Sequence, residues 1–259
     1  LVVSRLDRPI SEFMTDADVS VRPDLDQEEV ARLMARYNLP SVAVVDDTGR
    51  LLGRVTFDDV IDVVEAETTE DLLKFGGVSP DEELAAEWTA SVKSRLPWLY
   101  VNLITACIAG GVVYLFRDTV QRTVMLAVWM PIIAGMGGNA GTQALAVTVR
   151  RLALGLIPEQ QFLRVVGKEV LVGVTNGLAI GLVVGGIAAI VGQQPTLGLV
   201  VFLAMTVNLL VAGFAGAFIP IVLERMGVDP AIASSVFVTT FTDTCGFLLL
   251  LGLAGWLLL

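Results

Sequence analysis

Residues 231–259 read AIASSVFVTTFTDTCGFLLLLGLAGWLLL, a run long enough to cross a membrane as one helix. Asp243 is the only charged residue in this run. Placing a carboxylate near the middle of a bilayer costs about 2.5–3.5 kcal/mol on insertion scales. Such a residue therefore normally faces a neighbouring helix, a partner charge or a water-filled path. Two interpretations are open: a structural Asp hydrogen-bonded to another helix, or a cation or proton site.

The rest of the chain divides into an acidic part and an apolar part. Of the 259 residues, 54% are hydrophobic and the mean hydropathy is +0.73, which is too apolar for an ordinary soluble domain. Residues 1–95 carry 21 of the 27 acidic residues and 10 of the 17 basic ones. We therefore expect an acidic soluble part followed by a membrane part. Because an acidic surface repels nucleic acid, we expect no nucleic-acid partner.

Uncharged runs predict five transmembrane helices within residues 97–259. The first covers Pro97 to Phe116, and the second covers Thr123 to Val149. Residues 170–223 contain no charge, and a GQQPT turn at residues 192–196 divides them into the third and fourth helices. The run quoted above is the fifth. We expect membrane lipid to cover the apolar faces of these helices.

Basic residues fall mainly on one side of the predicted helices. Those on the side of the N-terminal part are Lys93, Arg95, Arg150, Arg151, Arg164, Lys168 and Arg225. The opposite side has Arg117 and Arg122. The positive-inside rule then predicts a multi-pass protein of the cell (inner) membrane with a cytoplasmic N-terminal domain.

The second predicted helix contains PIIAGMGGNAGTQ at residues 131–143. Pro and clustered Gly break or bend a helix, and irregular backbone within a bilayer must be buried in protein or line a cavity. Glycines alone also fit a tight helix contact, but the Asn139 amide needs a partner or water. In the fifth helix, Thr239, Thr242 and Asp243 share one face. Polar faces on two helices, with one carboxylate, are what a cation path requires.

Residues 9–64 predict a small module in the order β-α-β-β-α. DQEEVARLMARYNL is an amphipathic helix, and SVAVVDD and LLGRVTF are short strands joined by a turn at residues 46–50. FDDVIDVVEAE then continues as a second helix. The chain has no His, and its two cysteines, Cys107 and Cys245, lie in apolar runs. We therefore expect neither a disulfide framework nor His-based zinc or general-base chemistry.

Carboxylates are dense around the junction of the soluble and membrane parts. They are Asp58, Asp59, Asp62, Glu65, Glu67, Glu70 and Asp71, followed by Asp81, Glu82, Glu83 and Glu87. A solvated helix face is the simple interpretation. Carboxylates that face each other repel unless a cation lies between them, and divalent ions favour oxygen ligands. We favour a regulatory cation site.

Three motifs in this order resemble the MgtE family of magnesium channels and transporters. They are VTFDDVIDVVEAETTEDLLKFGGV at residues 55–78, PIIAGMGGNAGTQ at residues 131–143, and GVDPAIAS with TTFTDTCG at residues 227–246. The resemblance covers essentially the whole chain. It implies a mixed fold, in which a small α/β CBS module precedes an all-α membrane domain of five transmembrane helices. The implied domains are a CBS module at residues 1–66 (the second of a pair), an acidic connecting or plug-helix region at residues 67–96, and a channel domain at residues 97–259.

The resemblance also implies a homodimer with one path for hydrated Mg²⁺ between subunits, lined by the second and fifth spans. The pore residues that it implies are Asp243, Asn139, Gly138 and Thr239. Because Mg²⁺ loses its water reluctantly, two symmetry-related Asp243 carboxylates would hold the ion through its waters.

The family further implies gating by cytoplasmic Mg²⁺. The ion would bridge Asp26, Asp59, Glu67, Glu70 and Asp71, and would hold the helix at about residues 80–96 in a closed arrangement. Low Mg²⁺ would favour opening, a shift between two states through differential binding.

Two positions of the CBS module suggest a nucleotide ligand, and other features of the chain differ from the family pattern. Thr56 and Asp59 resemble the nucleotide-contacting positions of CBS modules, so ATP is a candidate ligand. Asn38 stands where the family often has an Asp. The first CBS module and the acidic helical domain that family members carry are not found within residues 1–259.

Alternative functions differ in the ion and in the chemistry. A broader divalent cation transporter fits the same residues, because nothing in them singles out Mg²⁺ over Mn²⁺, Co²⁺ or Ni²⁺. A proton-coupled carrier would use Asp243 as a relay. An intramembrane aspartyl enzyme would need two membrane carboxylates, and Asp243 alone lies well inside a span. We expect a magnesium channel or transporter that serves Mg²⁺ homeostasis and is not an enzyme.

Overall fold

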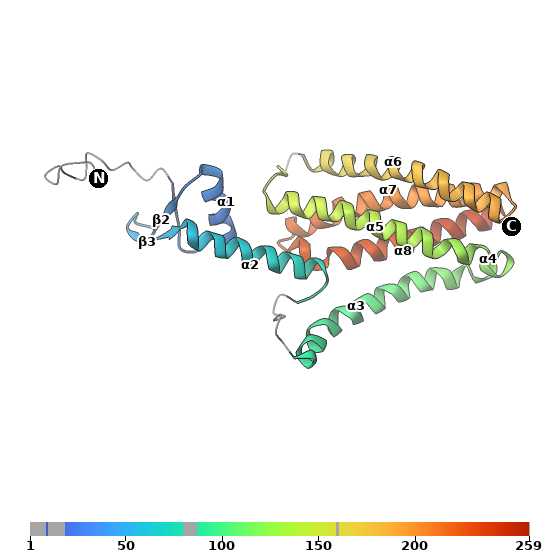
Figure 1. Cartoon of the computed structure of the whole chain (residues 1–259), viewed down its shortest axis with the longest axis horizontal. Coiled ribbons are helices and arrows are strands. Elements are labelled where there is room, and N and C mark those ends of the chain that lie inside the picture. The colour runs from blue at the N-terminus through green and yellow to red at the C-terminus, as the bar shows by residue number, and fades with distance from the viewer. Residues whose placement is uncertain (1–8, 10–18, 80–86, 159–160, 259) are drawn as a thin grey trace. The chain divides into compact units, whose positions relative to one another are not determined.

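The computed structural model describes residues 9, 19–79, 87–158 and 161–258, and its elements are shown in Figure 1. The elements are β1 (Ser20–Val21), α1 (Gln27–Tyr37), β2 (Ser41–Val45), β3 (Leu51–Thr56), α2 (Phe57–Phe75), α3 (Trp88–Leu115), α4 (Arg117–Arg122), α5 (Leu126–Ala153), α6 (Phe162–Val191), α7 (Pro195–Arg225) and α8 (Pro230–Leu257). The chain forms two compact units, Leu1–Glu70 and Asp71–Leu259, so their boundary falls inside α2. The mixed fold class is confirmed.

The first unit contains a three-stranded sheet in the order β1-β2-β3. β1 pairs with β2 in parallel, with α1 as the connection, and β2 pairs with β3 in antiparallel. The apolar face of α1 packs on the sheet and on α2, through Met34, Val42 and Val60 among other buried residues. The predicted β-α-β-β-α order is confirmed.

Two short polar residues end elements of this unit. Asn38 closes α1 in the left-handed conformation, with φ 52° and ψ 46°, and Asn adopts this conformation more readily than most residues. In the β2–β3 turn, the Asp46 carboxylate accepts hydrogen bonds from the Thr48 hydroxyl and from the backbone N–H groups of Thr48 and Arg50. These bonds, the Thr48 hydroxyl first, hold the pKa of Asp46 below its ordinary value. The predicted turn is thus held by its own Asp.

The second unit contains five long helices, α3, α5, α6, α7 and α8. The turn predicted at residues 192–196 is confirmed, because α6 ends at Val191 and α7 begins at Pro195. Gln193 takes a positive φ of 51° in this turn, a conformation that lets the chain reverse.

The beginning of the first long helix differs from the prediction. α3 begins at Trp88, and Pro97 lies inside it instead of at its start. Residues 88–96 are helical and continue without a break into the first predicted span. The rest of the helix predicted at about residues 80–96, residues 80–86, lies outside the described residues. Pro removes one backbone N–H, so a helix can continue through it at the loss of one hydrogen bond and with a bend.

Helices α3, α6, α7 and α8 are long and apolar enough to cross a membrane, as judged over the described residues. Helix α5 is 28 residues long but is less apolar, because Pro131, the glycines and the amides of its centre lower its hydropathy. The second predicted span, Thr123 to Val149, therefore has the required length without the usual composition.

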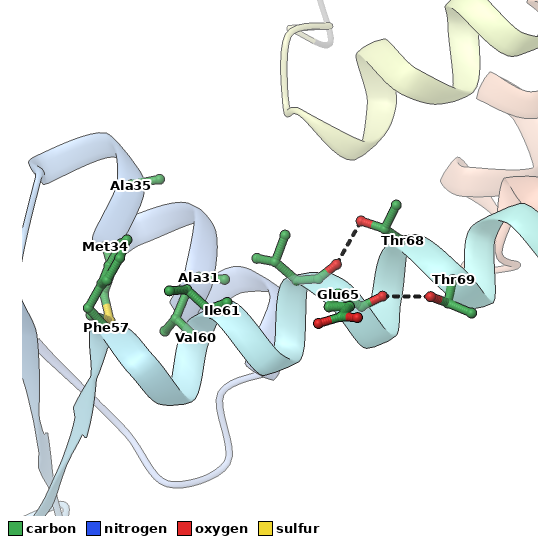
Figure 2. Close-up of a pocket in the computed structure, with 10 residues that line it drawn as sticks. Ala31, Met34, Ala35, Phe57, Val60, Ile61, Glu65, Thr68 and Thr69 are labelled. Carbon is green, nitrogen blue, oxygen red and sulfur yellow. Dashed lines mark hydrogen bonds between the residues drawn. The ribbon is translucent and has the colours of Figure 1, made fainter.

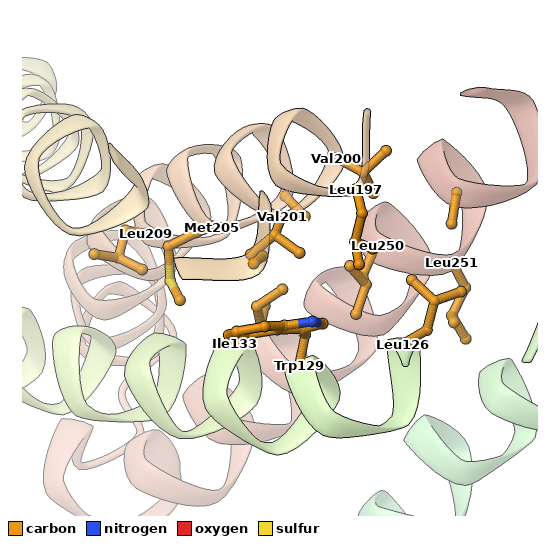
Figure 3. Packing of buried hydrophobic residues seen from close by; sticks show 13 residues of the cluster. Leu126, Trp129, Ile133, Leu197, Val200, Val201, Met205, Leu209, Leu250 and Leu251 are labelled. Carbon is orange, nitrogen blue, oxygen red and sulfur yellow. The ribbon is translucent and has the colours of Figure 1, made fainter. Parts of the chain in front are cut away.

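Helix α7 lies at the centre of the second unit. In its most apolar window 56% of the residues are buried, against 6% in that of α3. α7 packs against α5, α6 and α8. Figure 3 shows Trp129 and Ile133 of α5 facing Val201 and Met205 of α7 within the largest buried cluster, with Leu250 of α8.

The contact between α6 and α7 is unusually close, because glycine recurs every fourth residue on one face of α6. A Cβ atom added at any of these glycines would approach the backbone of α7 or the Thr206 and Phe202 side chains to under 3.0 Å. The Thr206 hydroxyl donates to the Gly177 carbonyl across this interface, at 3.1 Å. The glycines are Gly173, Gly177, Gly181 and Gly185. Small residues at this spacing let two membrane helices approach closely.

Candidate functional site

The candidate pore residues lie where α5 and α8 pack together. A Cβ atom at Gly138 would lie 3.8 Å from Thr239 Cγ2, so these two predicted residues face each other. One position earlier, a Cβ atom at Gly137 would lie 3.2 Å from the Cβ atom of Thr242. Gly137 and Gly138 of α5 therefore pack against the polar face of α8.

Asp243 lies on α8 immediately after the buried Thr242, and its side chain is partly exposed. Within the described residues, its carboxylate makes no hydrogen bond and no ion pair. Asn139 on α5 is exposed, as is Gln143 one turn later. In a bilayer these polar groups need water, an ion or another chain. The described part of one protomer does not provide such a partner for Asp243.

A small pocket continues from Thr239 toward the beginning of α8. It has a volume of about 200 Å³. Its lining residues are Gly76, Gly77, Trp98, Leu99, Asn102, Ser235, Val236 and Thr239. The Thr239 hydroxyl donates to the carbonyls of Ser235 and Val236, so toward any further group its oxygen can act only as an acceptor. The pocket therefore joins one predicted pore residue to the polar groups of Asn102 and Ser235.

The predicted regulatory residues are distributed along α1 and α2. Asp26 is the N-cap of α1, where its carboxylate accepts from the Glu28 backbone N–H at 2.8 Å. Gln27, the next residue, donates to the Glu67 carboxylate at 2.9 Å, which brings the start of α1 beside the middle of α2. Glu70 and Asp71 follow on α2, on either side of the boundary between the two units. No group of three acidic side chains gathers to hold a metal among the residues that the structure describes.

Thr56 and Asp59, the predicted nucleotide contacts, hydrogen-bond to each other. The Asp59 carboxylate accepts from the Thr56 hydroxyl at 2.6 Å and from its backbone N–H at 2.9 Å. Thr56 ends β3 and Asp59 lies in the first turn of α2, so the Asp59 carboxylate satisfies the backbone N–H and the hydroxyl of the residue that precedes the helix. The Thr56 hydroxyl, followed by its backbone N–H, holds the pKa of Asp59 below its ordinary value.

A pocket of the first unit lies between α1 and α2 and is mostly apolar (Figure 2). Phe57, Val60 and Ile61 of α2 line it opposite Met34 of α1, in a volume of about 480 Å³. Glu65 is the single charged residue of the lining. This composition suits neither a phosphate group nor a divalent cation.

The structure also reveals polar residues that the sequence pattern did not single out. Asn208 of α7 is fully buried and donates to the Ile133 carbonyl of α5 at 3.0 Å. Lys74 at the end of α2 pairs with Asp229, which directly precedes α8. Glu169 of α6 is 6% exposed. Asn208 lies in the 54-residue uncharged run at residues 170–223, and an amide among apolar residues away from the turn at residues 192–196 was the available signal.

Comparison with known proteins shows which family this chain is similar to. Residues 130–253 match the MgtE family, described as a divalent cation transporter, and residues 10–66 match the CBS domain. The chain is 37% identical to the magnesium transporter MgtE of Thermus thermophilus over 264 residues, 100% of this chain. The chain belongs to the MgtE family. The MgtE proteins of Bacillus subtilis and Enterococcus faecalis are 34% and 35% identical over 98% of this chain.

Membership of the MgtE family identifies a membrane protein of a transporter family and not an enzyme. The chain spans 56–58% of the length of these three relatives. A further relative, the inosine-5'-monophosphate dehydrogenase of Korarchaeum cryptofilum, is 35% identical over 51 residues, 20% of this chain. That similarity is confined to the CBS region and carries no enzymatic residues into the membrane part.

Proposed function

We propose that this chain forms a path for hydrated Mg²⁺ between the two subunits of a homodimer, lined by α5 and α8. The observation that carries the proposal is the Asp243 carboxylate, which is partly exposed within a membrane-spanning helix and has no partner among the described residues. The three MgtE relatives are named as magnesium transporters. A carboxylate that costs free energy in the bilayer is retained where a cation uses it.

The proposed path takes its polar groups from both helices. Asp243 supplies the negative charge, and the exposed amide of Asn139 supplies an oxygen ligand to water or to the ion. Gly138 and Thr239 lie in contact, so α5 and α8 present one continuous surface. A second copy would bring a second Asp243 carboxylate to the same path, and the two would hold Mg²⁺ through its hydration shell.

We propose that cytoplasmic Mg²⁺ regulates the path through Asp26, Asp59, Glu67, Glu70 and Asp71. Asp26 accepts a hydrogen bond from Glu28, Asp59 from Thr56 and Glu67 from Gln27. A bridging ion would therefore have to recruit their remaining lone pairs or replace a bond. Because one chain does not gather three of these groups, the ion would link them to acidic groups outside the described residues or in the second subunit.

The orientation and the ligands of the soluble unit follow from the same proposal. The basic residues between the second and third predicted spans support a cytoplasmic N-terminal unit through the positive-inside rule. ATP binding at Thr56 and Asp59 remains a prediction from resemblance. Their mutual hydrogen bonds give both residues a structural role without a nucleotide.

Replacement of Asp243 tests the proposed path. We expect Asp243→Asn to reduce Mg²⁺ flux into liposomes by at least about tenfold, because the charge that concentrates the cation is lost. The matched control is Asp118→Asn, a carboxylate of the exposed helix α4. Normal Mg²⁺ flux through Asp243→Asn would show that the path lies elsewhere.

The same liposomes distinguish the alternatives. Equal flux of Mn²⁺, Co²⁺ and Ni²⁺ would indicate a broader divalent cation transporter. Mg²⁺ uptake driven by a pH gradient without a Mg²⁺ gradient would indicate a proton-coupled carrier that uses Asp243 as its relay.

A further inference from the structure

A single buried amide joins the two helices of the proposed path to the central helix of the bundle. Asn208 of α7 is 0% exposed, and its Nδ2 atom donates to the Ile133 carbonyl of α5 at 3.0 Å. The acceptor atom Oδ1 is also buried and finds no donor among the described residues. An amide with an unsatisfied acceptor is costly in a membrane bundle, where an apolar side chain would pack without this loss.

The amide occupies a slot made by one glycine from each helix of the path. A Cβ atom added at Gly137 of α5 or at Gly246 of α8 would lie under 3.0 Å from Nδ2 of Asn208. Neither helix could therefore carry even an alanine at this level without moving the amide or the backbone. The three helices meet at one side chain.

This slot lies next to the candidate pore residues on both helices. Gly137 precedes Gly138, and Gly246 lies one turn after Asp243. Thr242, the neighbour of Asp243, packs against Gly137 with 3.2 Å between its Cβ atom and the added Cβ position. A change in the spacing of α5 and α8 at the slot would therefore move Asp243 relative to Gly138.

The middle of α5 has little side-chain bulk. Pro131 donates no backbone hydrogen bond, and Gly137, Gly138 and Gly141 separate the buried Ile133 from the buried Leu145. Apolar packing is non-directional, whereas the bond from Asn208 to the Ile133 carbonyl specifies both the rotation and the height of α5.

We propose that Asn208 is a positioning residue for ion selectivity: its amide fixes α5 and α8 at the separation that the hydrated Mg²⁺ path requires. This inference rests on the proposed function. Mg²⁺ demands nearly ideal octahedral geometry and dehydrates reluctantly, so a small change in the path discriminates between Mg²⁺ and the more readily dehydrated divalent ions.

The test compares the Mg²⁺ to Co²⁺ flux ratio of full-chain protein in liposomes. We expect Asn208→Ala to shift this ratio toward Co²⁺ by roughly fivefold or more, the lower range of coupling between sites. The matched control is Thr148→Val, which changes a fully buried hydroxyl of α5 that bonds within its own helix. An unchanged ratio in folded Asn208→Ala would overturn the inference.

A second variant separates positioning from packing, and it also serves if the single variant does not fold. In Asn208→Ala/Gly137→Ala the added methyl group refills the slot without restoring the hydrogen bond. Compared with Asn208→Ala, we expect the melting temperature of this double variant to return toward the wild-type value. We expect its Mg²⁺ to Co²⁺ flux ratio to stay shifted. A wild-type ratio in this variant would mean that packing alone suffices, and would overturn the inference.

The experiments distinguish failure of the proposed Mg²⁺ path from failure of the positioning role of Asn208. If Asp243→Asn conducts Mg²⁺ normally, the proposed path is wrong whatever Asn208 does. If Asp243→Asn loses Mg²⁺ flux while both Asn208 variants keep the wild-type ratio, the path stands and the positioning role of Asn208 falls.

Discussion

Asp59 and Asp243 are both carboxylates on helices, but their surroundings give them different roles. Asp59 accepts two hydrogen bonds from Thr56 and starts α2. Asp243 has no such partner among the described residues and lies partly exposed within a helix that can cross a membrane. A carboxylate satisfied by its own helix is a structural group, whereas one left without a donor at membrane depth attracts a cation.

The cap at Asp59 makes a prediction about pH. Its pKa in the folded state is lowered, so its stabilising contribution is present above the unfolded-state pKa and is lost as the pH falls through the folded-state pKa. Asp59→Asn should speed hydrogen exchange in the first turn of α2 at neutral pH. The difference from wild type should shrink in acid, and mass spectrometry of the β3–α2 peptides measures it.

Asp58→Asn is the matched control for this experiment, because Asp58 lies in the same turn but does not accept the bond from Thr56. Equal exchange in Asp58→Asn and Asp59→Asn would show that charge at the helix start matters and that the specific bond does not.

At the scale of elements, the last turn of α2 is joined to the start of α8 by an ion pair. Lys74 is 12% exposed and Asp229 is 31% exposed, so water screens the pair only partly. Asp229 directly precedes α8 and Pro230 begins it, which is where a capping carboxylate is expected. The Asp229 carboxylate therefore connects the end of α2 to the helix that carries Asp243.

Charge reversal tests this connection. Lys74→Asp or Asp229→Lys alone should destabilise the second unit by about 1–2 kcal/mol, between the values for exposed and buried pairs. The double reversal should recover most of that loss, as measured by thermal unfolding in detergent and analysed as a double-mutant cycle. Additive losses in the cycle would mean that the two charges do not interact.

The sequence predicted elements better than it predicted contacts between them. Charge-free runs located α5 to α8, and the Gly192–Thr196 turn was placed correctly because Pro and Gly mark it locally. The start of α3 at Trp88 was missed, because a proline was read as a helix boundary. The contact of Gly138 with Thr239 and the slot around Asn208 join residues far apart in the chain, and no local pattern encodes such pairs.

At the scale of the whole molecule, the chain combines a CBS module with a membrane domain, and α2 runs from one unit into the other. The predicted acidic residues Glu67, Glu70 and Asp71 lie around this boundary. In the proposed regulation, α2 is the element that belongs to both units and would carry the effect of bound Mg²⁺ from the first to the second. Such coupling requires that Mg²⁺ bind more tightly to the closed state than to the open one.

Neutralising these carboxylates tests the regulatory role. The variant Glu67→Gln/Glu70→Gln/Asp71→Asn should keep its Mg²⁺ flux when Mg²⁺ on the cytoplasmic side is raised to a level that closes the wild type. Patch-clamp recording at several internal Mg²⁺ concentrations measures the shift. As a control, Asp46→Asn/Asp47→Asn removes charge from the β2–β3 turn and should close normally. A variant that closes as the wild type does would remove these residues from the sensor.

The glycines of α6 have a consequence for how the membrane domain moves. Because each of the four touches the backbone or fixed side chains of α7, the α6–α7 pair has no room to slide or to compress. Helix α3, by contrast, is almost entirely unburied within the protomer. We expect opening and closing to be taken up by α3, α5 and α8 against a rigid α6–α7 hairpin. In an alanine scan of α6, replacement of any of these four glycines should therefore reduce the yield of folded protein. The loss should not depend on which ion is present or on whether the path is open or closed.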